Sequence, residues 1–127
     1  MSPSSSTAGV VIVDHGSVRP EANQQLERFV EAFRAVSPVA IVEAAHMELA
    51  EPSIASAFRR CVERGAAQIV VIPYFLGPGK HWREDIPRLA AEASREQGGV
   101  GYRVGEPIGL HPMMLEVVRA RLDECLR

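Results

Sequence analysis

The sequence has few of the features that mark disulfide-rich, membrane-spanning or nucleic-acid-binding proteins. Its two cysteines, Cys61 and Cys125, lie far apart and lack the paired spacing of a zinc or redox motif. Val10 to Val13, the longest apolar run near the start, is far shorter than a secretory core or a membrane span. The formal net charge of -2 provides no broad basic field for nucleic acid or an anionic membrane. We therefore expect a soluble cytoplasmic protein with no nucleic-acid or membrane partner, and two thiols that are buried or half-buried.

The length fits one folded domain. The chain has 127 residues, and compact domains commonly run to about 100 to 200 residues. The opening segment, residues 1–8, is small and polar, with four serines and a proline. It offers too little apolar surface to offset the entropy of ordering it. We expect a disordered tail over residues 1–8 and a single domain over residues 9–127.

Short apolar runs alternate with amphipathic segments along the rest of the chain. Gly9 to Val13 (GVVIV) is nearly all apolar and rich in β-branched residues, which is typical of a parallel strand covered on both faces. Further strands are predicted at 39–45, 68–75 and 100–104, and helices at 20–36, 52–65, 83–96 and from Pro112 to the end. Four strands alternating with four helices predict an α/β fold, a single three-layer domain in which helices cover both faces of a four-stranded parallel sheet.

Chemically active side chains follow each predicted strand. In an open parallel sheet, ligands bind just beyond the carboxyl ends of the strands. The residues found there are His15 after the first strand, His46 and Glu48 after the second, Lys80 and His81 after the third, and His111 after the fourth. All four histidines of the sequence therefore fall on one edge. Imidazoles with a carboxylate and without thiolates suit an open, exchangeable site for a divalent transition metal.

Three ordered motifs and a final loop carry a family resemblance. They are DHGS at Asp14–Ser17, HMELAEPSI at His46–Ile54, PYFLGPGKHWREDIP at Pro73–Pro87, and the loop EPIGLHP at Glu106–Pro112. From Val10 onward the chain resembles the short sirohydrochlorin chelatases of the CbiX/SirB family. The resemblance implies a flavodoxin-like or chelatase-like fold and a lyase that inserts a divalent metal into sirohydrochlorin.

The residues of these motifs most resemble those of the iron-inserting branch of the family seen in plants, which makes sirohaem. The resemblance thus favours Fe2+ as the metal substrate, with cobalt insertion in the anaerobic cobalamin pathway as the alternative. A cysteine-rich tail is absent before the last residue, Arg127, so no iron–sulfur cluster and no tightly bound cofactor are expected. The histidine-rich insert of some nickel or cobalt members is absent too, which disfavours those metals.

The resemblance also assigns roles to residues at the edge. His15 and His81 are the implied metal ligands and proton acceptors, and Glu48 is a third ligand or proton relay. The alternative for each histidine is a helix cap. The neighbouring Glu51 precedes a proline at a helix start, where a carboxylate stabilises the helix dipole and needs no catalytic role.

Further residues lie on or near the same predicted edge. His46 could orient Glu48 or touch substrate, although a buried core histidine is equally plausible, and His111 is expected to be a helix-start residue. A broad ring rich in carboxylates calls for cationic and N–H donors beside an apolar wall. The candidates for binding it are Ser17, Arg19, His46, Lys80, Trp82 and Arg83. Because one open sheet supplies one wall of a cleft, and short members of the family pair, we expect a homodimer.

Two other functions use the same residues. Asp14, His15 and Ser17 are the residue types of a hydrolase or phosphoryl-transfer enzyme, although neither a G-x-S-x-G elbow nor a phosphate-binding Gly-rich loop occurs. A metal or tetrapyrrole carrier would use the same edge without catalysis.

Overall fold

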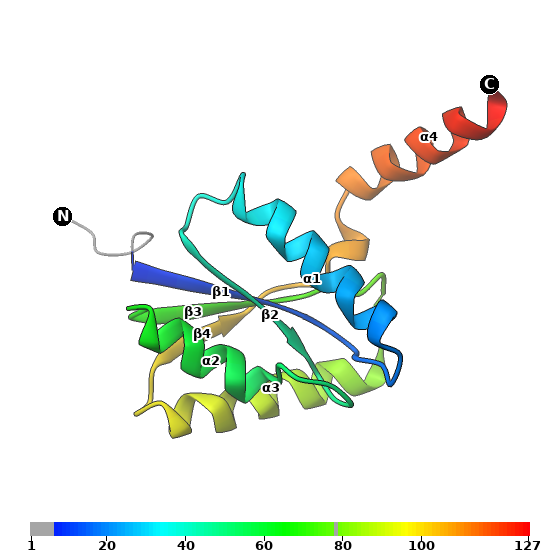
Figure 1. Cartoon of the computed structure of the whole chain (residues 1–127). Helices are drawn as coiled ribbons and strands as arrows, with labels where there is room; N and C mark the ends of the chain where they lie inside the picture. Colours follow the sequence, from blue (N-terminus) through cyan, green and yellow to red (C-terminus); the bar gives the residue numbers. More distant parts are fainter. Residues whose placement is uncertain (1–6, 78) are drawn as a thin grey trace.

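The computed structural model describes residues 7–77 and 79–127, and for residues 80–82 it describes the backbone only (Figure 1). Strands and helices alternate along the chain, as the sequence predicts. In chain order the elements are β1 (Ala8–Asp14), α1 (Pro20–Arg34), β2 (Ile41–His46), α2 (Ile54–Glu63), β3 (Gln68–Pro73), α3 (Lys80–Glu96), β4 (Gly101–Val104), the short 3-10 helix η2 (Ile108–Leu110) and α4 (Met113–Leu126).

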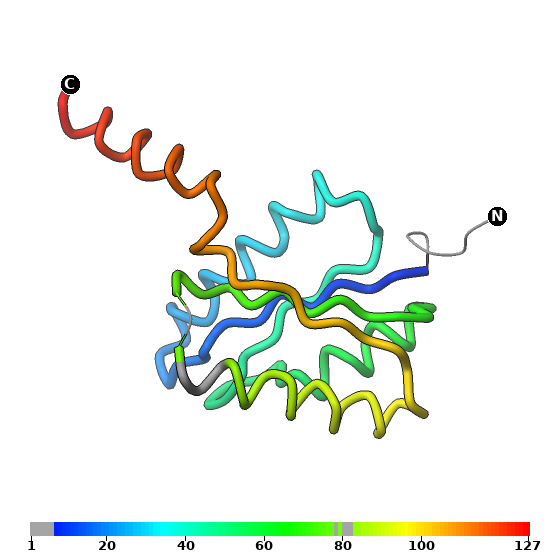
Figure 2. The backbone as a smooth tube through the Cα atoms, turned by 180° about the vertical axis from the view of Figure 1, so that it is seen from behind, coloured from blue at the N-terminus to red at the C-terminus, as the bar shows by residue number. Residues whose placement is uncertain are grey.

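The strands form one sheet in the order β2-β1-β3-β4, and every neighbouring pair is parallel. Helix α1 covers one face, whereas α2 and α3 cover the other (Figures 1 and 2). A parallel sheet between helices on both faces is the predicted fold class, which is confirmed.

Alternate residues of β1 enter two separate clusters, one on each face of the sheet. Val11 and Val13 pack with the fully buried Phe58 of α2 on one face. Ile12 packs with Leu26 and Val30 of α1 on the other. Successive side chains of a strand point to opposite faces, so a strand that is apolar at every position must be covered twice. This explains the unbroken apolar run at the start of the sequence.

Hydrogen bonds from side chains mark the start of α2. The Ser53 hydroxyl accepts a hydrogen bond from the Ser56 amide at 3.1 Å and caps the helix. Glu51 Oε1 accepts from the Ser56 hydroxyl at 2.8 Å and from the Ser53 amide at 3.1 Å. Both bonds lower the pKa of Glu51 from its ordinary value, and the bond from Ser56 has the larger effect. The structural role predicted for Glu51 is confirmed.

Several element boundaries differ from the prediction. Strand β1 begins at Ala8, which is buried, so the ordered chain reaches into the expected tail; residues 1–6 of that tail lie outside the described residues. Strand β2 starts at Ile41, because the Ser37 hydroxyl bonds both the amide and the carbonyl of Val39 in a turn. Helix α3 starts at Lys80 rather than Arg83, with Gly79 in extended conformation as its N-cap.

The last helix departs most from the expected packing. Instead of covering the sheet, α4 extends away from it, and the apolar side chains at 115, 118, 122 and 126 are 54% to 75% exposed (Figure 1). Cys125 is exposed as well, contrary to the prediction. Cys61 is buried as predicted, and burial raises the pKa of its thiol to about 12. Within the described part of the chain, no helix is both long and apolar enough to cross a membrane.

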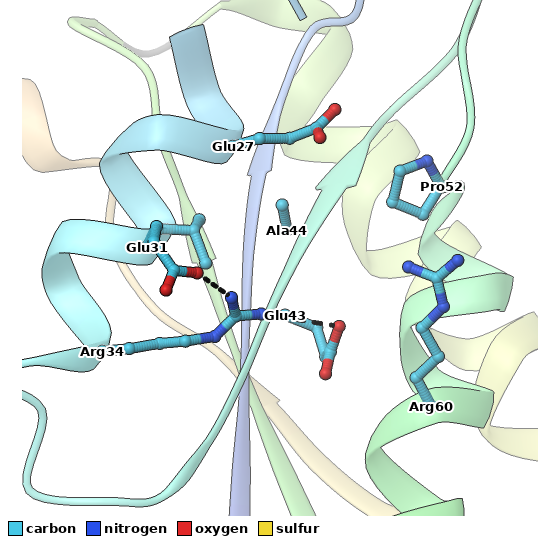
Figure 3. A pocket seen from close by; sticks show the side chains of 8 residues that line it. Glu27, Glu31, Arg34, Glu43, Ala44, Pro52 and Arg60 are labelled. Atoms are coloured by element: carbon cyan, nitrogen blue, oxygen red, sulfur yellow. Dashed lines mark hydrogen bonds and ion pairs between the residues drawn. The ribbon is translucent and has the colours of Figure 1, made fainter. Parts of the chain in front are cut away.

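A buried carboxylate on the outer edge of the sheet discourages another strand from pairing there. Glu43 lies on the edge strand β2 with 8% of its surface exposed. Its carboxylate accepts a hydrogen bond from Arg64 Nη1 at 2.9 Å and lies 3.9 Å from Arg34 Nη2. Arg34 also donates to the Val42 carbonyl from Nε at 3.0 Å and from Nη2 at 2.8 Å. Figure 3 shows Glu43 of β2 and Glu31 of α1 beside Arg34. These side chains, with Arg60 of α2, line a pocket of about 180 Å³. An inward charge and a covered carbonyl discourage further strands from joining this edge.

Replacing Glu43 with glutamine is expected to lower the free energy of unfolding by about 1 to 3 kcal/mol, since the two arginines lose a nearly buried charged partner. Urea denaturation followed by circular dichroism measures this change. The control is Glu27→Gln, an exposed glutamate of the same pocket, which should shift the free energy by less than about 0.5 kcal/mol. Equal effects of the two substitutions would contradict the role given to Glu43.

Candidate active site

The loops that follow the strands meet at one edge of the sheet, because the strands are parallel. The chain passes from β1 to β2 on one side of β1, whereas β3 pairs with its other side. The strand order therefore reverses between β1 and β3. In open α/β sheets this is the point where ligands bind, and the loops after β1 and β3 are those that carry His15 and His81.

Backbone hydrogen bonds continue the sheet beyond the ends of its strands. The amide of Met47 donates to the Asp14 carbonyl at 2.8 Å, and the amide of Glu48 donates to the His15 carbonyl at 3.1 Å. On the other side of β1, the Tyr74 amide donates to the Val13 carbonyl at 2.7 Å. His15 and Glu48 are thus aligned by the main chain, not by contacts between side chains alone.

A glycine allows the two loops to approach this closely. Gly16 has φ +91°, a left-handed conformation that L side chains rarely adopt. A Cβ at this position would lie 1.8 Å from the carbonyl oxygen of Glu48. The glycine of the DHGS motif is therefore needed for the contact between the first and second loops.

His15 lies between an acidic and an aromatic side chain. Its Nδ1 is 3.9 Å from Glu48 Oε2, and the two side chains are 60% and 58% exposed. On the other side, the ring of Phe75 meets the imidazole edge-to-face, with 5.4 Å between ring centroids and an interplanar angle of 88°. The site thus offers an exposed nitrogen and a carboxylate oxygen beside an apolar surface that follows β3.

His46 is buried and is paired with Asp14. The ring is 0% exposed, and its Nδ1 lies 2.6 Å from Asp14 Oδ1. Among the described residues its Nε2 has no hydrogen-bond partner. The short contact makes Nδ1 the ring nitrogen that is bonded to the Asp14 carboxylate. His46 has no exposed surface for a substrate and bonds to Asp14 rather than Glu48, so the structure favours the core histidine over the predicted substrate contact.

The loop between β1 and α1 is closed by its own polar groups. Asn23 Oδ1 accepts from the Ser17 amide at 3.0 Å, and Asn23 Nδ2 donates to the Ser17 carbonyl at 2.8 Å. The Ser17 hydroxyl accepts from the Arg19 amide at 3.0 Å. Asp14 is engaged with His46. The hydrolase alternative needs Asp14 and Ser17 to form a relay with His15, but Asp14 is paired with His46 and Ser17 closes the loop.

The predicted residues of the third loop fall at the start of α3. Lys80, His81 and Trp82 are in its first turn, and their side chains lie outside the described residues. Arg83, the next residue, is exposed. Among the side chains that the structure does describe, no group of three or more His, Cys, Asp or Glu residues is arranged to hold a metal.

His111 is exposed at the start of α4, where its Nδ1 accepts a hydrogen bond from the Met113 amide at 3.1 Å. The helix-start role predicted for it is confirmed. Of the four histidines, His111 is therefore at a helix start and His46 is in the core, which leaves His15 and His81 as candidates for the site.

Sequence reasoning missed Phe75 and the pairing of Asp14 with His46. In the sheet, Asp14 and His46 are register partners at the ends of β1 and β2. Adjacent acidic and imidazole side chains at the ends of two paired strands were the available signal, but it depends on a register that a single sequence does not fix. Phe75 was predicted as the last residue of a strand and lies in the third motif, but neither position distinguishes a site residue from a core residue.

The chain is similar in sequence to proteins of a known family. The model of the CbiX family matches residues 9–125. The chain is 52% identical over 118 residues to the chloroplastic sirohydrochlorin ferrochelatase of Arabidopsis thaliana, covering 93% of this chain and 52% of that protein. It is 31% identical over 137 residues to a sirohydrochlorin cobaltochelatase of Methanopyrus kandleri, covering 92% of this chain and 96% of that protein.

A solved structure has the same architecture. The sirohydrochlorin chelatase SirB of Bacillus subtilis, solved in complex with cobalt, superposes with a TM-score of 0.84 and 30% identity, covering 93% of this chain and 50% of that one. The present chain thus spans about half the length of the plant relative and of SirB. With a family match over nearly its whole length and the same fold, the chain belongs to the CbiX family.

Proposed function

We propose that this chain is a sirohydrochlorin chelatase, a lyase that inserts a divalent metal ion, Fe2+ in the first place, into sirohydrochlorin. The observation that carries the proposal is the exposed pair of His15 and Glu48, whose nitrogen and oxygen lie 3.9 Å apart. His15 follows β1, next to the point where the strand order reverses, and Glu48 follows the neighbouring strand β2. The names of the relatives point to the same reaction.

The spacing of the pair suits one shared ion. Bonds from imidazole nitrogen and carboxylate oxygen to a divalent transition metal are about 2.0 to 2.2 Å long. Tetrahedral ligands at this bond length lie about 3.4 Å apart, so two atoms 3.9 Å apart can bind the same ion after a side-chain movement of about 0.5 Å. Because both side chains are more than half exposed, the ion would keep open positions that the ring nitrogens of a substrate can occupy.

Insertion exchanges one divalent ion for two pyrrole protons, so the site needs bases as well as ligands. His15 and Glu48 can each accept a proton after releasing the metal to the ring. We propose His81 as the second imidazole, with the same two roles. Its support is the motif at residues 73–87 and the position of residue 81 in the first turn of α3, at the same edge as His15.

The substrate would lie against an apolar surface with cationic groups around it. Phe75 supplies an aromatic face beside His15. Arg19 and Arg83 are exposed at the starts of α1 and α3, where guanidinium groups can bind carboxylates of the ring. We propose them, with Ser17, Lys80 and Trp82, as the substrate-binding residues, and we propose that no further cofactor is required.

The choice of metal rests on relatives rather than on the geometry of the site, since an imidazole–carboxylate site accepts several first-row ions. The plant relative is named a ferrochelatase and the archaeal one a cobaltochelatase. Iron is the first choice because identity to the plant protein is higher, and cobalt is the alternative. A homodimer and a cytoplasmic location stay predictions; the plant relative is named chloroplastic.

Anaerobic absorbance spectroscopy of sirohydrochlorin with Fe2+ or Co2+ tests the function. We expect the protein to accelerate the spectral change that marks metal insertion. If the protein binds the ring or the ion while the rate stays at the uncatalysed value, it is a carrier and the proposal fails. Turnover of chromogenic esters or phosphates, with no acceleration of insertion, would favour the hydrolase alternative instead.

A further inference from the structure

A polar pair occupies the last positions of two neighbouring strands. Asp14 ends β1 and His46 ends β2, and the two residues are register partners in the parallel sheet. His46 Nδ1 lies 2.6 Å from Asp14 Oδ1; the imidazole side chain is 0% exposed and the carboxylate side chain is 22% exposed. Burying a polar contact costs free energy that an apolar pair of similar size would not cost. Filling of the core therefore does not account for this contact.

The chain continues from both members of the pair to the proposed metal-binding side chains. His15 directly follows Asp14, and Glu48 comes two residues after His46. Any shift of one strand end relative to the other would change the 3.9 Å that separates His15 Nδ1 from Glu48 Oε2. The contact between Asp14 and His46 thus joins the two strands directly before the residues that would share an ion.

The loop that carries Glu48 begins and ends at His46. The His46 amide donates to the Pro52 carbonyl at 2.8 Å, and His46 forms an isolated parallel bridge with Ser53. Within the loop, Leu49 has φ +72°, a conformation that is unfavourable for a residue other than glycine. A strained loop keeps one conformation only when its surroundings hold it. The side chain of His46 connects the base of this loop to β1.

The main-chain bonds between the two loops lie at the exposed end of the sheet. They run from the Met47 amide to the Asp14 carbonyl and from the Glu48 amide to the His15 carbonyl. Bonds at the end of an element open more easily than those in its middle. A buried side-chain contact one position earlier would keep them closed, because a hydrogen bond restricts both the distance and the angle between its groups.

We propose that Asp14 and His46 are positioning residues of the site: their contact fixes the two loops relative to each other, and thereby sets the distance between His15 and Glu48 and the affinity for the metal ion. They act through the backbone of the two loops. The inference rests on the proposed function, because it takes His15 and Glu48 as the groups that share the ion.

Binding of Co2+ alone, followed anaerobically by its visible absorbance, tests the proposal with two variants of one residue. His46→Leu fills a similar volume without a nitrogen, and we expect it to bind Co2+ about tenfold more weakly, with an altered spectrum. His46→Asn keeps a side-chain nitrogen near the position of Nδ1, and its affinity should stay within about threefold of the unsubstituted value. Unchanged affinity in His46→Leu, or an equal loss in both variants, would overturn the proposal.

Val42→Ala is the matched control for a loss of stability alone. Val42 is fully buried in the same strand and packs in the cluster below α1. Its truncation leaves a cavity and lowers the midpoint of urea denaturation, but the contact between Asp14 and His46 stays intact, so Co2+ affinity should not change. If Val42→Ala weakens Co2+ binding as much as His46→Leu does, the pair has no positioning role.

A double-mutant cycle shows whether the two side chains act as one contact. Asp14→Ala removes the other partner at a partly exposed position, where the risk of misfolding is lower. We expect the variant with both Asp14→Ala and His46→Leu to bind Co2+ about tenfold more weakly, as each single variant does, because the second substitution removes nothing further. A loss of about 100-fold, the product of two independent effects, would contradict the proposal.

Hydrogen exchange without metal separates this inference from the chelatase function. We expect the amides of Met47 and Glu48 to exchange about tenfold faster in His46→Leu than in the unsubstituted protein, and at the unsubstituted rate in His46→Asn. This result would support the positioning role even if the protein inserted no metal into sirohydrochlorin. Metal insertion by the unsubstituted protein, with equal exchange rates in all three proteins, would overturn the positioning role and leave the proposed function standing.

Discussion

Replacing His15 with alanine is expected to lower the rate of metal insertion about 100-fold or more, since the substitution removes a metal ligand and a proton acceptor together. Glu48 Oε2, 3.9 Å away in the unsubstituted protein, would be left without the ligand that shares the ion. The change should be visible without turnover as well, because the visible absorbance of bound Co2+ reports the loss of a nitrogen ligand. Stability should hardly change, because the His15 side chain is 60% exposed.

The matched control is His111→Ala at the same edge. Its Nδ1 accepts one hydrogen bond from the Met113 amide, so the substitution should cost about 1 kcal/mol of stability and leave Co2+ binding intact. A His15→Ala protein that inserts metal at the unsubstituted rate would remove the basis of the proposed function.

Replacing Gly16 with alanine is the substitution near the site with the largest expected effect on folding. The added Cβ would meet the Glu48 carbonyl oxygen at 1.8 Å, and the φ of +91° is unfavourable for alanine in any case. We expect the free energy of unfolding to fall by about 2 to 5 kcal/mol, a large part of the stability of a small domain. The insertion rate should fall at least tenfold, since the two loops that carry His15 and Glu48 must separate.

Gly65→Ala provides the control for this substitution. Gly65 has a comparable φ of +104°, but a Cβ there would meet nothing within 4 Å. It should cost about 1 to 2 kcal/mol and leave insertion unchanged. The difference between the two variants in urea denaturation isolates the contact between the loops. If both variants lose the same stability, the close approach of Gly16 to Glu48 does not constrain the site.

The order of elements and the edge that carries the site could be predicted from the sequence. Hydrophobic periodicity separates strands from helices, and parallel strands bring every loop after a strand to the same edge. That reasoning located His15 and Glu48 correctly on this edge, because each directly follows a predicted strand. It also gave Glu51 and His111 their structural roles, which depend on local hydrogen bonds near a helix start.

The sequence does not predict which surfaces pack against one another. The apolar stripe of α4 predicts that this face is covered, but a pattern within one helix does not say by which surface or by which copy of the chain. The side chain of His46 was ambiguous for a similar reason. At the last position of β2 it could turn to the solvent or to the core, and its bond to Asp14 follows from strand register, which periodicity does not determine.

At residues 15 and 48, the stability of the loops and the choice of metal ion depend on different atoms. The amide of Glu48 and the carbonyl of His15 extend the sheet, whereas the side chains of the same residues face outward. The backbone of these two residues therefore stabilises the fold, and their side chains would determine which ion binds. Substitutions at residues 15 and 48 can therefore change the metal-binding atoms one at a time, because the backbone hydrogen bonds that hold the two loops do not depend on the side chains.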